Sequence, residues 1–123
     1  INDCYNSNPR ALDAMVDALV AMPGGRHIVV AGEMLELGPD AEALHAACGG
    51  RMKQRGVSVL VGVRGMARAM VQAARANGLD TLFFETPQAA GEWMKANVGP
   101  GDVVLLKASR GVRLEKALAE LPQ

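Results

Sequence analysis

Short runs of aliphatic, often β-branched residues alternate along this chain with longer stretches of helical periodicity. The clearest runs are Arg26–Ala31, Val57–Gly62, Thr81–Phe84 and Val103–Lys107. Such runs are typical of strands that are buried on both faces of a parallel sheet, where the crossover connections are helices. The alternation therefore predicts an α/β fold: a Rossmann-like, doubly wound, mostly parallel sheet with helices on both faces.

Capping residues and apolar spacing mark the helices between these runs. Asn8 and Thr86 can cap helices, and a proline follows each of them at the first helical position. The predicted helices begin at or near Pro9, Pro39, Met66, Pro87 and Gly111. For the second helix, Gly49–Gly50 is expected to weaken the structure. Its predicted apolar face consists of Ala43, Leu44, Ala47 and Met52.

Chain length and charge restrict the possible functions. The 123 residues suffice for one compact domain but not for two, so we assign residues 1–123 to a single domain. Thirteen basic residues balance thirteen acidic ones, which gives no reason to expect nucleic acid or a membrane as a partner. Two cysteines and two histidines do not form a metal-site spacing, and this cysteine usage fits a reducing cytoplasm. The chain opens at Ile1 inside a predicted strand, so we expect a fragment of a longer protein.

Four loops follow the carboxyl ends of predicted strands, which is where ligands bind in doubly wound sheets. They are Asp3–Pro9, Gly32–Gly38, Gly62–Gly65 and Lys107–Gly111. The first and the last of these loops hold the polar residues that are hardest to explain by structure alone. The sequence therefore predicts a ligand site where these two loops meet.

The first loop combines an acid, a tyrosine and two asparagines in front of a helix N-terminus. Asn6 and Asn8 can both donate and accept hydrogen bonds, so they could hold a peptide-like ligand, and Asp3 could bind ribose hydroxyls or a cation. The alternative is structural, with Asn8 as a helix cap and Asp3 in a turn. One cap does not require Tyr5 and Asn6 as well, so the combination favours a binding site.

The last loop places a hydroxyl and a guanidinium after a buried strand. Arg110 offers a planar fork that suits a carboxylate or a phosphate, and Ser109 adds a hydrogen-bonding group. A structural interpretation is equally good on composition alone, with Ser109 as a helix cap and Arg110 as a surface residue.

Two acids occupy the loop between Gly32 and Gly38. Glu33 and Glu36 would repel a phosphate, so this loop could meet an amino group or a neighbouring domain, or it could be a plain connection. His45 follows among apolar positions, and we interpret it as a partly buried structural histidine.

Three segments resemble a known family. Asp3–Pro9 is similar to the D-x-Y-N-A-N-P segment that opens the C-terminal domain of the UDP-N-acetylmuramoyl-tripeptide–D-alanyl-D-alanine ligases, which belong to the Mur ligases. Ala31–Gly38 resembles their L-G-D-M-x-E-L-G loop, and the segment from Lys107 to Glu115 resembles K-G-S-R-x-M-x-L-E. The three segments keep the family order and together span nearly the whole chain. The departures from the family pattern are Ser7 for Ala, Glu33 for Asp, Ala108 for Gly and Val112 for Met.

The resemblance implies one domain of a three-domain, cytoplasmic, ATP-dependent amide ligase of peptidoglycan precursor synthesis. ATP would activate the carboxylate of the UDP-muramoyl tripeptide as an acyl phosphate, which the amine of D-Ala-D-Ala attacks. ATP and Mg²⁺ would be bound mainly by a central domain that is not present here. Asp3 would contact the ATP ribose, and Asn6, Asn8, Ser109 and Arg110 would orient the dipeptide. No catalytic residue and no metal ligand are assigned to this segment, and we expect a monomer that turns over nothing by itself.

Two other classes fit the fold. A receiver-like signalling module would need a phosphoacceptor aspartate after a middle strand, and Val61–Arg64 offers none. A stand-alone nucleotide-binding module would need a glycine-rich phosphate loop, which the acidic segment Gly32–Gly38 does not provide.

Overall fold

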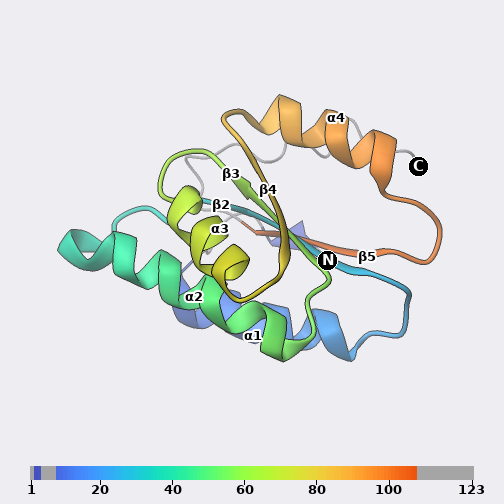
Figure 1. Cartoon of the computed structure of the whole chain (residues 1–123), viewed down its shortest axis with the longest axis horizontal. Coiled ribbons are helices and arrows are strands. Elements are labelled where there is room, and N and C mark those ends of the chain that lie inside the picture. The colour runs from blue at the N-terminus through green and yellow to red at the C-terminus, as the bar shows by residue number, and fades with distance from the viewer. Residues whose placement is uncertain (1, 4–7, 108–123) are drawn as a thin grey trace.

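A parallel sheet forms the centre of the structure, a computed structural model that describes residues 2, 3 and 8–107. Its five strands lie in the order β1-β5-β2-β3-β4, and every neighbouring pair is parallel. This arrangement, visible in Figure 1, confirms the predicted α/β fold. The strands are β1 (Asn2–Asp3), β2 (His27–Gly32), β3 (Val59–Val63), β4 (Asp80–Phe84) and β5 (Val103–Lys107).

Helices connect the strands and cover both faces of the sheet. Helices α1, α2 and α3 lie on one face, and α4 lies on the other (Figure 1). A short 3-10 turn, η1, leads into α2. The bounds are α1 (Pro9–Ala21), η1 (Gly38–Asp40), α2 (Ala41–Arg55), α3 (Ala67–Ala76) and α4 (Pro87–Asn97). The helix predicted from Gly111 lies outside the described residues.

Two of the helices begin at the caps that the sequence predicted. The side-chain oxygen of Asn8 accepts a hydrogen bond from the Ala11 N–H at 2.8 Å, and that of Thr86 accepts one from the Ala89 N–H at 3.1 Å. Each bond satisfies one of the backbone donors that the first helical turn leaves without an intrahelical partner. These local signals explain why α1 and α4 begin where they were expected to begin.

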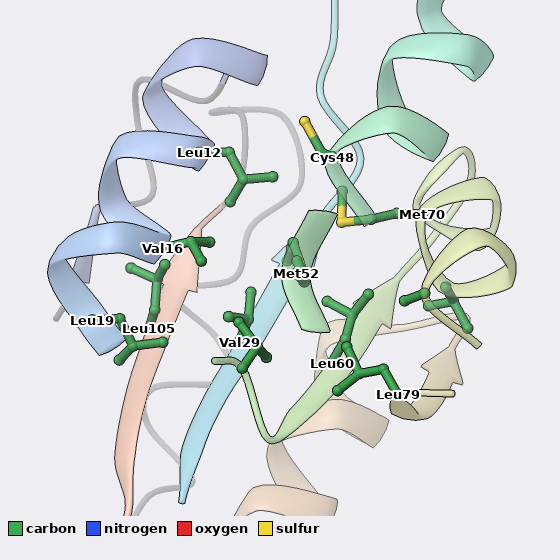
Figure 2. Close-up of a cluster of buried hydrophobic side chains, with 14 of the residues drawn as sticks. Leu12, Val16, Leu19, Val29, Cys48, Met52, Leu60, Met70, Leu79 and Leu105 are labelled. Atoms are coloured by element: carbon green, nitrogen blue, oxygen red, sulfur yellow. The ribbon is translucent and has the colours of Figure 1, made fainter. Parts of the chain in front are cut away.

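The core has two layers, one on each face of the sheet. The larger layer joins α1, α2 and α3 to the sheet, and Figure 2 shows side chains from these helices meeting Val29, Leu60 and Leu105 of the strands. The smaller layer joins α4 to the opposite face through Ala90 and Met94. Because both faces of the sheet are covered, the central strands β2 and β3 are apolar apart from His27 at the start of β2, as the sequence indicated.

Helix α2 buries a different face from the one predicted. Ala43 and Ala47 are exposed, and Leu44 is only partly buried. The buried residues are Ala41, His45, Cys48, Gly49 and Met52. This set has regular helical spacing, but it includes a histidine and a glycine that a search for apolar residues passes over. The prediction holds for Met52 but was wrong for the two alanines and Leu44, because apolar residue type alone does not show which side of the helix faces the core.

Gly49 explains why α2 runs through the glycine pair without a break. A Cβ atom at this position would lie 2.7 Å from the carbonyl carbon and 2.9 Å from the Cα of Met70, with the carbonyl oxygen nearer still. The absence of a side chain lets the backbones of α2 and α3 approach each other closely. The helix propensity lost at Gly49 is therefore the cost of tight packing between these two helices.

An ion pair closes the amino end of the sheet. The Arg26 guanidinium contacts Asp102 through Nε at 3.2 Å and Nη2 at 2.8 Å, and it also donates to the Asn97 carbonyl at 2.7 Å. The hydrogen bond from Arg26 and a second one from the Gly99 N–H lower the pKa of Asp102 from 3.8 to about 2. These bonds tie the first residues of β2 and β5 to the end of α4.

We expect Asp102→Asn to lower the melting temperature at pH 7. Because the folded pKa of Asp102 lies below its unfolded value, the carboxylate stabilises the fold above about pH 4. This contribution is lost as the pH falls toward 2, so the difference between wild type and variant should shrink over that range. Thermal melts at pH 7, 4 and 2 measure it, with the exposed Asp80→Asn as the control. An unchanged difference at pH 2 would contradict the assignment.

Candidate functional site

The register of the strands brings the three family-like segments to one edge of the sheet. Asp3 pairs with Lys107 across β1 and β5, and Ala31 pairs with Lys107 across β2 and β5. Because all strands are parallel, the segments that follow Asp3, Ala31 and Lys107 leave from the same carboxyl edge. The described starts of the three segments therefore lie at one edge, while the predicted meeting of the first and last loops stays a prediction.

The structure describes only some of the predicted site residues. The backbone of Asp3 ends β1. Asn6, Ser109 and Arg110 lie outside the described residues. Asn8 is exposed and caps α1 through its side-chain oxygen, so its structural interpretation is confirmed. The side-chain nitrogen of Asn8 takes no part in that bond, and a second role in ligand binding stays a prediction.

Lys107 is a feature of the site that the sequence did not single out. Its side chain is 1% exposed, although it lies at the carboxyl end of β5 in the middle of the candidate site. An ammonium group is costly to bury unless polar groups compensate it. The sequence shows that Lys107 begins the segment Lys107–Gly111. Its burial depends on the strand order, which places β5 between β1 and β2.

The acidic loop between β2 and α2 is tied to the loop between β3 and α3. The Glu33 carboxylate accepts a hydrogen bond from the Met66 N–H at 3.2 Å and lies 4.0 Å from the Arg64 guanidinium. It also fills the space beside Gly65, where a Cβ atom would lie 2.5 Å from the Glu33 Cδ. Glu33 is thus a link between two loops of the site.

His45 holds the same loop from the protein interior. The ring is fully buried, as the interpretation of a structural histidine requires. Its Nε2 accepts a hydrogen bond from the Met34 N–H at 2.7 Å, and its Nδ1 lies 2.6 Å from the Ala41 carbonyl oxygen. A carbonyl can only accept, so Nδ1 carries the proton and the ring is the neutral tautomer.

A shallow cavity opens beside this loop, between α2 and α3. Its volume is about 280 Å³, and its walls carry acidic, basic and amide groups. Arg68 lies on one wall, with its guanidinium 4.2 Å from the centre of the Phe83 ring and 2.8 Å from the Glu85 carboxylate. The lining residues are Glu33, Glu42, Gly65, Met66, Arg68, Ala69 and Gln72.

The described residues contain neither a cluster of metal ligands nor a helix that could span a membrane. Within residues 2, 3 and 8–107, no three side chains of His, Cys, Asp or Glu gather as a metal site would require. In the same part of the chain, no helix combines the length and apolar character needed to cross a bilayer.

The match to a known family covers most of the chain. Residues 1–110 match the family described as Mur ligase, glutamate ligase domain. The chain therefore belongs to this family of ligase domains. This assignment favours the ligase interpretation over the receiver-like and nucleotide-binding alternatives.

Named relatives make the match more specific. A UDP-N-acetylmuramoyl-tripeptide–D-alanyl-D-alanine ligase of Mycobacterium leprae is 38% identical over an alignment 139 residues long. The alignment covers 98% of this chain and 27% of that protein. The ligase of the same name from Synechocystis sp. is 31% identical over 121 residues, with the same two coverages. The chain thus spans 27% of the length of these curated relatives.

Solved structures agree on the fold. A MurF ligase from Thermotoga maritima in complex with ADP has a TM-score of 0.78 and 28% identity, over 96% of this chain and 26% of that chain. A MurF from Acinetobacter baumannii has a TM-score of 0.85 and 25% identity, over 97% of this chain and 27% of that chain.

Proposed function

We propose that this chain is the acceptor-binding domain of an ATP-dependent amide ligase that adds D-Ala-D-Ala to UDP-N-acetylmuramoyl-tripeptide in peptidoglycan precursor synthesis. The observation that carries this proposal is the strand order β1-β5-β2, which brings the three family-like segments to one edge. The names of the relatives support the same substrates. The reaction would proceed through an acyl phosphate that the dipeptide amine attacks.

The remaining parts of the reaction would belong to other domains. Because the chain spans 27% of its relatives, we infer that residues 1–123 form one domain of a longer, three-domain enzyme. The ADP in a structural neighbour supports the use of ATP. The resemblance to the Mur ligases implies that Mg²⁺, which would neutralise the phosphates, is held mainly by the central domain. We expect the enzyme to be a cytoplasmic monomer.

The chain's own residues would act by orientation. Asp3 would hold the ribose of ATP, while Asn6, Asn8, Ser109 and Arg110 would orient the dipeptide. Fixing an amine against an acyl phosphate lowers the barrier through proximity, without a general acid or base from this domain.

We expect the 123-residue chain alone to release no phosphate from ATP, whereas the complete ligase that carries it should do so. Release should require both UDP-N-acetylmuramoyl-tripeptide and D-Ala-D-Ala, because the acyl phosphate needs an acceptor to turn over. A coupled phosphate assay that omits one substrate at a time measures this dependence. Turnover by the isolated chain, or turnover of the complete enzyme that is indifferent to D-Ala-D-Ala, would contradict the proposal.

A further inference from the structure

The loop of residues 33–37, which joins β2 to α2, is fixed at two consecutive residues. Glu33 is fixed through its own side chain, and Met34 is fixed through its backbone N–H. Glu33 reaches outward to the Met66 N–H at 3.2 Å. The N–H of Met34 donates inward to the buried ring of His45 at 2.7 Å, and the Met34 side chain is itself 2% exposed in the core. The loop is therefore anchored on both sides immediately before its exposed tip.

The tip of this loop has a conformation that needs such anchors. Glu36 has a φ angle of 61°, in the left-handed region that residues other than glycine seldom adopt. The preceding Leu35 is 41% exposed although it is a large apolar residue. Strained backbone at an exposed tip persists only where the surrounding structure determines it. The bonds of Glu33 and His45 hold the two residues that lead into this tip.

His45 can serve as an anchor because its hydrogen bonds have a fixed direction. The Ala41 carbonyl takes the proton of Nδ1 at 2.6 Å, so Nε2 must present a lone pair to Met34. The ring is fully buried, so water cannot replace this acceptor without opening the core. A side chain without an acceptor would leave the Met34 N–H buried and unsatisfied.

We propose that His45 and Glu33 are positioning residues, which hold this loop so that Leu35 and Glu36 face the acceptor side of the ligase site. The inference rests on the proposed function and adds to it two residues that touch no substrate. The register supports the location, because Ala31 at the end of β2 pairs with Lys107 of β5. The loop that follows β2 thus leaves the sheet from the same edge at which β5 ends with Lys107.

The first test measures the loop in this chain and needs no activity. Hydrogen exchange of the Met34 amide should speed up about tenfold or more in His45→Leu, the expected effect of losing one buried hydrogen bond. His45→Gln should recover part of the protection, because its side-chain oxygen can accept from Met34. His27→Gln is the matched control, since the His27 ring contacts the Met22 carbonyl at the opposite end of β2. Unchanged exchange in His45→Leu would overturn the inference.

The second test uses the complete ligase. His45→Leu should raise the KM for D-Ala-D-Ala about tenfold and change the KM for ATP less than twofold, because only the acceptor side loses its geometry. Glu33→Ala should act in the same direction. Because the Glu33 side chain is partly exposed, we expect this variant to fold. Equal changes in both KM values, or none in either variant, would overturn the inference. A wild-type ligase that ignores D-Ala-D-Ala would instead refute the proposed function, and the exchange measurement would still decide whether the loop is held.

Discussion

Replacing Gly49 with alanine is expected to lower the free energy of unfolding by about 3 kcal/mol, the upper part of the usual range for an overpacked core. The added methyl group would collide with the Met70 carbonyl, with 2.7 Å to its carbon. This neighbour is helix backbone, so it cannot move aside as a flexible side chain would. The two helices must separate, and the core layer that they share with the sheet must loosen.

Gly50→Ala is the matched control for this substitution. A Cβ at Gly50 would meet only the Asn77 side-chain nitrogen, at an ordinary 3.6 Å. Alanine is the better helix former by about 1 kcal/mol, so Gly50→Ala should leave stability unchanged or raise it. Urea unfolding of the two variants beside the wild type measures both effects. Equal effects of the two substitutions would show that helix propensity, and not the contact with α3, decides stability here.

In the complete ligase, Arg110→Lys should raise the KM for D-Ala-D-Ala by about 10- to 100-fold. The proposed role of Arg110 is to grip the dipeptide carboxylate with two parallel hydrogen bonds, which a lysine cannot form. Losing one charge-assisted hydrogen bond costs about 1.5–3 kcal/mol, which corresponds to this range. Arg110 lies outside the described residues, so this prediction rests on the family-like segment and on the register of Lys107 at its start.

Arg113→Lys provides the control for Arg110. It makes the same chemical change at a position where the family pattern allows any residue, so the KM should stay within about twofold. Steady-state kinetics with varied D-Ala-D-Ala and saturating ATP give the comparison. If both substitutions raise the KM equally, the effect is not specific to Arg110, and a carboxylate grip by this residue is contradicted.

The sequence predicted the elements of the fold well because their signals are local. Both helix caps, Asn8 and Thr86, work through bonds to residues three positions away. The run Val103–Lys107 forms β5 with the bounds that were expected. The buried face of α2 was mispredicted because small apolar residues occur on both sides of this helix, and residue type alone does not show which side lies against the core.

The order of the strands and the contacts within the site required the structure. Nothing in the composition of β5 indicates that it lies between β1 and β2, since all buried parallel strands have similar residues. The bond between Glu33 and the Met66 N–H joins residues that are 33 positions apart. It forms because β2 and β3 are neighbours and their loops leave from the same edge. Residue type identified the candidate site residues, but their contacts depend on which loops the sheet brings together.

The position of β5 also sets the order in which the sheet can be assembled. Strands β2, β3 and β4 are neighbours both in the chain and in the sheet, so they can pair as soon as they have been synthesised. The only sheet neighbour of β1 among the described residues is β5, which follows it about a hundred positions later. Until β5 inserts, β1 has no pairing partner and β2 has an open edge. Asp3 and Lys107, which pair across these strands, can therefore come into register only once β5 has inserted between β1 and β2.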